Sequence, residues 1–173
     1  MLLLEVGQLA FDDFIYMHGS TSYDSLSLTM TLAHELQHFV QHESAISLWA
    51  ANSLVPKLPN DVIATLGLTW CDIPHECEAR IVSKRIAEGL FGGARTDQHI
   101  EAKIGQRVTD ADAADWECIR RLDTSVPYDL DAETGLLFAR LKPYRQDLEK
   151  VLQSLKSYPD FGTVDLDALL KSG

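Results

Sequence analysis

The sequence predicts an α+β fold that is predominantly helical, with a short N-terminal β element before the first long helix. Strand-like signals occur only in residues 1–18. From Ser25 onward, apolar residues recur with the spacing of amphipathic helices. Helix-starting and helix-stopping residues then alternate to the C-terminus.

The first elements are two short strands and a long helix. The strands are expected at residues 2–6 and 14–17, with Gly7 and an Asp pair between them. The helix is expected to begin at Ser25 or Ser27, either of which is a fair N-cap, and to run towards Leu54 until Pro56 stops it.

A second helix is bracketed by its end signals. Asp72 is the expected N-cap, Pro74 lies in the first turn, and Gly92 and Gly93 follow the last apolar residue. Further helices are expected at residues 97–108, 110–122, 132–141, 144–158 and 165–170.

Length and composition favour one domain over residues 1–173, with a motif core at about 14–92 and a helical C-terminal part at about 97–173. The chain is 46% apolar, enough for a sizeable core. Its apolar runs are much shorter than the roughly 20 residues of a membrane span. We therefore expect no membrane crossing.

The charge balance constrains the partners. Fifteen basic and 26 acidic side chains give a net charge of −11. Binding to nucleic acids or anionic lipids requires clustered Lys and Arg, so neither partner is expected. A peptide or protein fits better.

The start of the chain and the cysteines predict a cytoplasmic location. The first residues lack the basic region of a secretory signal. Cys71, Cys77 and Cys118 form an odd set without scaffold-like spacing, so free buried cysteines are the simplest interpretation. A zinc cluster of Cys71, His75 and Cys77 would lack a fourth ligand.

Residues 34–38 read HELQH and predict a metal site. In a helix, His34 and His38 lie one turn apart on the same face, so both imidazoles can reach one zinc ion. Glu35 stands beside them as a general base. The alternative is a pair of surface histidines with a solvated acid between them.

The apolar residues around this motif suggest which side of the helix packs. With His34 at zero on a helical wheel, His38 falls at about 40°, whereas an apolar stripe spans about 140–240°. That stripe is expected to pack, leaving the histidines to line a cleft. It consists of Leu32, Leu36, Phe39 and Val40.

Catalytic zinc needs a third protein ligand, with the fourth position left to water. The candidates are Glu76, Glu78, His75, His42 and His99. Glu76 lies in the middle of the apolar arc of its helix, where an acid is costly unless something binds it. Glu78 falls about 200° away beside Arg85, which would be an ordinary surface partner. Glu76 is therefore the preferred ligand. The apolar arc is formed by Ile73, Ala79, Val82, Ile86, Ala87 and Leu90.

HELQH followed by ECEAR at residues 76–80 resembles the gluzincin metallopeptidases, especially the soluble ImmA/IrrE-type proteases. The resemblance implies a minimal zincin-like domain with Glu76 as the zinc ligand. It also implies that residues 14–19 hold an extended substrate. Arg80 stands where these families usually have Asp or Asn.

The expected function is peptide-bond hydrolysis by water activated on Zn²⁺, with Glu35 as the general base. Transition-state donors could come from Tyr128, His99, Arg80 or His75. The alternative is a non-enzymatic protein-binding or regulatory domain that retains a zincin-like fold. An intact Glu35 favours the enzyme, because a structural metal site has no use for a base.

Overall fold

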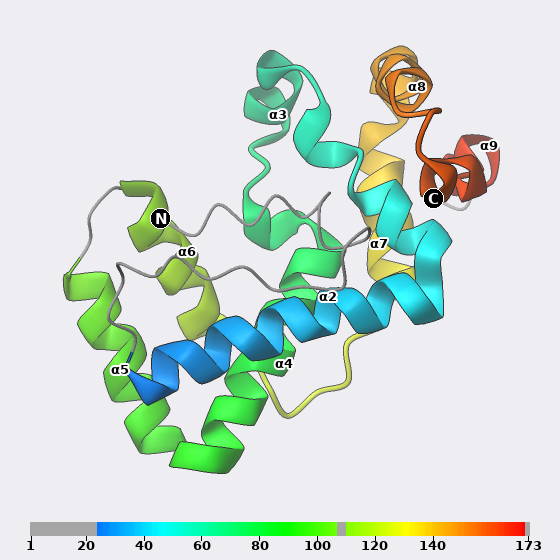
Figure 1. Ribbon diagram of the computed structural model, residues 1–173. Coiled ribbons are helices and arrows are strands. Elements are labelled where there is room, and N and C mark those ends of the chain that lie inside the picture. The colour runs from blue at the N-terminus through cyan, green and yellow to red at the C-terminus, as the bar shows by residue number, and fades with distance from the viewer. Residues whose placement is uncertain (1–23, 107–109, 172–173) are drawn as a thin grey trace. The chain divides into compact units, whose positions relative to one another are not determined.

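A computed structural model describes residues 24–106 and 110–171. Every element in these two ranges is helical (Figure 1). The α-helices are α2 (Ser25–Asn52), α3 (Asn60–Leu66), α4 (Pro74–Phe91), α5 (Gly93–Gly105), α6 (Asp110–Arg121), α7 (Leu130–Leu141), α8 (Arg145–Ser154) and α9 (Leu166–Leu169). Short 3₁₀ helices are η1 (Val55–Lys57), η2 (Trp70–Asp72), η3 (Lys142–Tyr144) and η4 (Pro159–Thr163).

The predicted α+β class is wrong, because the described part of the chain is all-α and contains no strand. The strands expected at residues 2–6 and 14–17 lie outside the described residues. The class had rested on those two segments alone. Helical periodicity and local caps account for the elements that follow.

The chain divides into two compact units. The first comprises Met1–Phe39 and Ala79–Val126, and the second Val40–Glu78 and Pro127–Gly173. Each unit has its own apolar cluster, described separately below. One domain over residues 1–173, with its two sequential parts, stays a prediction.

The first unit has a small core and buries a charged residue at the end of a helix. Its α5 packs along α6. The Nζ of Lys84 is buried and donates to the carbonyls of Arg120 and Leu122, 3.1 and 2.8 Å away, at the C-terminal end of α6. A cation there satisfies carbonyls that lack a partner within the helix. The buried core residues are Leu26, Met30, Ala87, Ile100 and Ile119.

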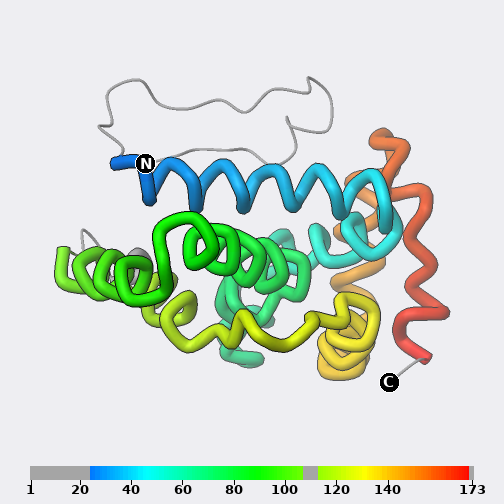
Figure 2. The backbone as a smooth tube through the Cα atoms, turned by 90° about the horizontal axis from the view of Figure 1, so that it is seen from below, coloured from blue at the N-terminus to red at the C-terminus, as the bar shows by residue number. Residues whose placement is uncertain are grey.

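The second unit has the larger core. Its α7 packs against α9 and η3, which in turn contacts α8. Figure 2 follows this part of the chain from yellow to red. The largest fully buried side chains of its core include Phe138, Leu54, Leu141 and Leu148. Asn52 is also buried, and its Nδ2 donates to Thr134 Oγ1 at 2.8 Å.

The long helix α2 begins at Ser25, one of the two expected starts, but its N-cap is the residue before, and the helix bends in its C-terminal half. Asp24 is the cap, because its Oδ1 accepts from the amides of Leu26 and Ser27. The bend lies at Ala45, which has non-helical angles (φ −147°, ψ 48°). Just before it, Ser44 Oγ donates to the carbonyl of Val40 at 2.6 Å, a bond that often bends helices.

The start of α4 differs in detail from the expectation. Asp72 ends η2 and accepts from the amide and hydroxyl of Thr69, both at 2.7 Å, so it caps η2 and not α4. Pro74 is the first residue of α4. Gly92 follows the helix with φ 86°, an angle that favours glycine.

Candidate metal centre

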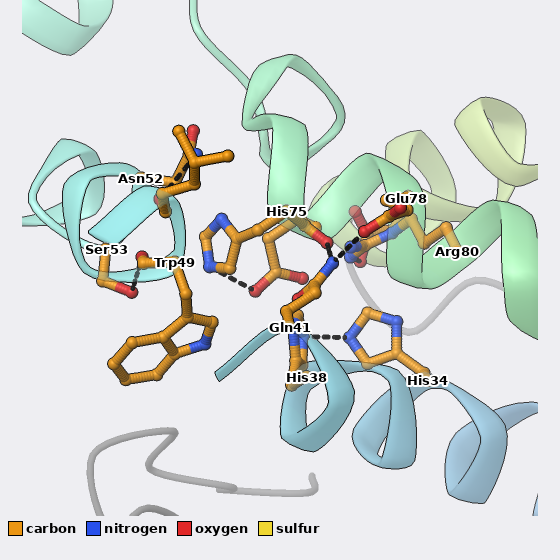
Figure 3. Close-up of polar contacts among 12 residues, drawn as sticks. His34, His38, Gln41, Trp49, Asn52, Ser53, His75, Glu78 and Arg80 are labelled. Carbon is orange, nitrogen blue, oxygen red and sulfur yellow. Dashed lines mark hydrogen bonds and ion pairs between the residues drawn. The ribbon is translucent and has the colours of Figure 1, made fainter. Parts of the chain in front are cut away.

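The two motif histidines point their Nε2 atoms towards one place. They lie one turn apart on α2, and the two Nε2 atoms are 3.0 Å apart (Figure 3). The ring centroids are 4.5 Å apart with an interplanar angle of 88°. His38 is buried and His34 half-buried.

The histidine face of α2 is the buried face, so the expected packing of the apolar stripe is wrong. His38 is 3% exposed and Gln41 1%, whereas Leu36, Phe39 and Val40 are 55%, 49% and 50% exposed. The most apolar side of a helix is usually the side that packs. Here polar side chains with specific partners occupy the interior instead.

Glu35 follows His34 and is buried as well. Its place in the motif and its burial suit a proton acceptor beside a metal.

Glu76 lies in the first turn of α4 and is 5% exposed. The expected apolar arc around it is only partly correct, because Ile86 and Leu90 are exposed. The buried face also contains small and polar residues, so Glu76 is not the only charged group there. These residues are Ala79, Arg80, Ser83, Lys84 and Ala87.

His34, His38 and Glu76 form a group that could hold a metal ion. One ligand atom from each lies within 4.8 Å of the other two. Donors placed about 2.1 Å from a tetrahedral ion are roughly 3.4 Å apart, so small adjustments would bring all three into range. Two imidazoles and a carboxylate form a donor set used by catalytic zinc.

Gln41 binds the residues on either side of the predicted third ligand in the sequence, and the His75 ring lies beside that ligand. Gln41 Nε2 donates to the His75 carbonyl and to Glu78 Oε2, each at 2.8 Å (Figure 3). The Nε2 of His75 lies 3.7 Å from Glu76 Oε1. Sequence reasoning missed Gln41, although its spacing of three residues from His38 keeps it near the histidine face.

Glu78 does not have the expected partner. It accepts from Gln41, whereas Arg85 donates to the carbonyls of Thr124 and Val126 at 2.8 and 3.2 Å. Glu78 is half-buried, and it is not in the group that could hold a metal.

No protein-family model matches this chain, and no curated protein or solved structure matches it either. The resemblance to gluzincins therefore rests on the HELQH and ECEAR motifs. Among the helices of residues 24–106 and 110–171, none is both long and apolar enough to cross a membrane.

His42, weighed above as a ligand, has other contacts. Its Nδ1 lies 3.2 Å from Glu43 Oε1 and its Nε2 3.3 Å from Asp160 Oδ2. Its ring meets Trp49 edge-on at 5.1 Å. Both ring nitrogens therefore face carboxylates outside the metal group.

His99 belongs to the cap of α2. Its Nε2 lies 3.1 Å from Ser27 Oγ and its Nδ1 3.8 Å from Asp24 Oδ1. Burial is the main reason that the pKa of His99 is lowered; Lys103 adds to this, and Asp24 opposes it. His99 is thus neither a ligand in the metal group nor placed beside it.

Two of the suggested transition-state donors have partners of their own. Burial, followed by the nearby Cys77, raises the pKa of Tyr128, so its phenol stays protonated. Arg80 forms an ion pair with Asp115 at 3.0 Å.

The expectation of three free cysteines is wrong. Cys71 and Cys118 are disulfide-bonded, whereas Cys77 is half-buried and keeps its thiol. A zinc cluster using Cys71 needs its thiolate, which a disulfide removes.

Proposed function

We propose that this chain is a zinc-dependent metallopeptidase in which His34, His38 and Glu76 hold the ion. The convergence of their ligand atoms within 4.8 Å is the observation that carries the proposal. Imidazoles favour zinc over magnesium or calcium, and three protein ligands leave a position for water.

Glu35 is the proposed general base. Zinc, when bound, supplies Lewis acidity that activates a water and polarises the substrate carbonyl. Glu35 would accept a proton from the attacking water and return it to the nitrogen of the leaving amine. The C–N bond breaks, and the products are a carboxylate and an amine.

The test separates metal binding from catalysis. Glu35→Gln should abolish hydrolysis but leave zinc bound, whereas His34→Ala should lose both. Zinc is measured by elemental analysis of protein purified without added metal. Hydrolysis is measured by mass spectrometry on a diverse peptide library, since a protease dedicated to one partner would look inert on generic peptides. Loss of zinc in Glu35→Gln, or turnover in either variant, would contradict the assignment.

The third ligand has its own test. Glu76→Ala should reduce the zinc content of the purified protein, because two imidazoles alone hold zinc weakly. Glu88→Ala is the matched control, because Glu88 lies on the same helix, accepts from Thr124 Oγ1 and is outside the metal group; it should keep its zinc. Equal zinc in native protein and Glu76→Ala would show that another residue completes the site.

The second candidate is a regulatory or protein-binding domain without enzymatic activity. The exposed Leu36, Phe39 and Val40 on α2 favour it, because clustered apolar side chains on a surface often mark protein contacts. This candidate predicts bound zinc and no peptide cleavage, with Glu35→Gln indistinguishable from native protein.

The cellular location can be tested through the cysteines. A cytoplasmic location stays a prediction, and it expects three reduced thiols. With Cys71 and Cys118 disulfide-bonded, Cys77 is instead the one cysteine that keeps a thiol. Alkylation in denaturant at cell lysis, followed by mass spectrometry, counts the thiols. Three modified cysteines would agree with a cytoplasmic location, whereas one modified cysteine would contradict it.

A further inference from the structure

We propose that Gln41 is a positioning residue that sets the carboxylate of Glu76 for metal binding. This inference rests on the proposed metal site. The buried side-chain amide of Gln41 holds the first turn of α4, which carries Glu76.

Gln41 uses both protons of its side-chain amide in the second unit. The Nε2 atom donates to the His75 carbonyl and to Glu78 Oε2, each at 2.8 Å (Figure 3). Both partners accept only, so the amide has one orientation that satisfies them. The residue is 1% exposed, and water cannot easily replace these bonds.

The two acceptors lie on either side of Glu76 in the sequence. The His75 carbonyl belongs to the peptide group that leads into Glu76, and Glu78 follows two residues later. Gln41 thus holds the main chain immediately before the ligand and a side chain just after it. A ligand held from both sides loses less freedom when it binds an ion.

Gln41 is itself placed by the helix that carries the histidines. It is seven residues after His34 and three after His38, which puts it about 20° from His34 on the helical wheel. The bend of α2 at Ala45 comes after all three residues. One helical face therefore carries both imidazoles and the amide that holds α4.

Asn52 provides a matched control. It lies on the same helix, is fully buried, and also donates twice from its amide, to the Leu48 carbonyl at 2.9 Å and to Thr134 Oγ1 at 2.8 Å. Its partners do not adjoin Glu76. A purely structural role for Gln41 would make the two residues equivalent in metal binding.

The experiment compares Gln41→Met with Asn52→Leu in the full chain. Both remove amide donors at nearly constant volume. Zinc affinity is measured by competition with a chelating dye, and Co²⁺ absorption in the visible range reports the ligand geometry. We expect Gln41→Met to weaken zinc binding by about 10- to 100-fold and to alter the Co²⁺ spectrum. Asn52→Leu should change affinity less than about threefold while keeping the native spectrum, whatever its effect on stability.

A second background tests whether Gln41 acts through Glu76. In Glu76→Ala, adding Gln41→Met should cause no further loss of affinity, because the positioned ligand is already gone. If Gln41→Met does not fold, Gln41→Asn takes its place; it keeps an amide but is one methylene shorter, so the same direction of change is expected.

Failure of the role proposed for Gln41 can be distinguished from failure of the proposed metal site. Native zinc affinity and a native Co²⁺ spectrum in folded Gln41→Met would overturn this inference while leaving the metal site intact. So would an equal loss in Asn52→Leu, or a full additional loss in the Glu76→Ala background. Native protein that binds no zinc, or binds it equally after His34→Ala, would overturn the metal site and this inference together.

Discussion

His99 illustrates how burial sets the charge of a single side chain. Its environment favours the neutral ring, mainly through burial, and its pKa is lowered below the usual 6.5. Asp24, which caps α2, opposes this shift but does not cancel it. The unfolded chain therefore takes up a proton at a higher pH than the folded chain does.

The direction of the resulting pH dependence follows. Stability from neutral His99 is fully present above pH 6.5 and is lost as the pH falls towards the folded-state pKa. We expect His99→Gln to flatten the decline in the free energy of unfolding between about pH 7.5 and 5, measured by urea denaturation with a chelator present. Parallel curves for the two proteins would show that His99 titrates alike in both states.

At the residue scale, the spacing of residues along a helix predicted which side chains of that helix lie close together. The interval between His34 and His38 is one helical turn, so their convergence needs nothing beyond a helix. The choice of Glu76 over Glu78 depended on the face of one helix, and Glu76 is the one in the metal group. The hydrogen bonds of Gln41 could not be predicted from helical spacing, because its partners lie more than thirty positions away in the sequence.

At the scale of elements, helix positions were more predictable than the side that packs. The expected helices have observed counterparts with shifted ends, whereas α3 was not expected. This helix lies between Pro59 and Gly67, and it ends at Gly67, which has a φ of 60°. A helix this short has little periodicity to detect. The predicted packed side of α2 was wrong, because a helical wheel compares the apolarity of the faces and contains no information about polar partners.

The orientation of α2 leads to a direct comparison of two truncations. Met30→Ala should lower the free energy of unfolding by about 2–5 kcal/mol, since Met30 is buried in the core of the first unit. Leu36→Ala, on the same helix, should change it by no more than about 0.5 kcal/mol because Leu36 is exposed. Urea denaturation in the presence of a chelator measures both. A large cost at Leu36 would mean that the apolar stripe packs after all.

At the scale of the whole molecule, two strand-like segments near the N-terminus were not enough to predict the fold class. Secondary-structure patterns report local preference, whereas class depends on what the whole chain forms. Within the described ranges, both cores are built from helices and the turns between them, without a strand. The net charge of −11, by contrast, bears on partners and not on fold.

Metal binding should also affect the stability of the whole molecule. Glu76 is far from the two histidines in the sequence, so the unfolded chain does not present all three ligands together, and zinc would bind the folded state selectively. At a free zinc concentration 100 times the Kd, this selectivity adds about 2.7 kcal/mol. For a chain of this length, each kcal/mol raises Tm by roughly 2–4 °C. Zinc should therefore raise Tm by about 5–11 °C over protein in chelator.

The matched variants make that shift specific to the site. Glu76→Ala should lose most of it, whereas Glu88→Ala should keep it, because Glu88 accepts from Thr124 on the same helix and does not belong to the metal group. Differential scanning calorimetry, with and without a chelator, provides the comparison. Equal shifts in the two variants would mean that zinc stabilises the protein from a different site, since linkage reports binding wherever it occurs.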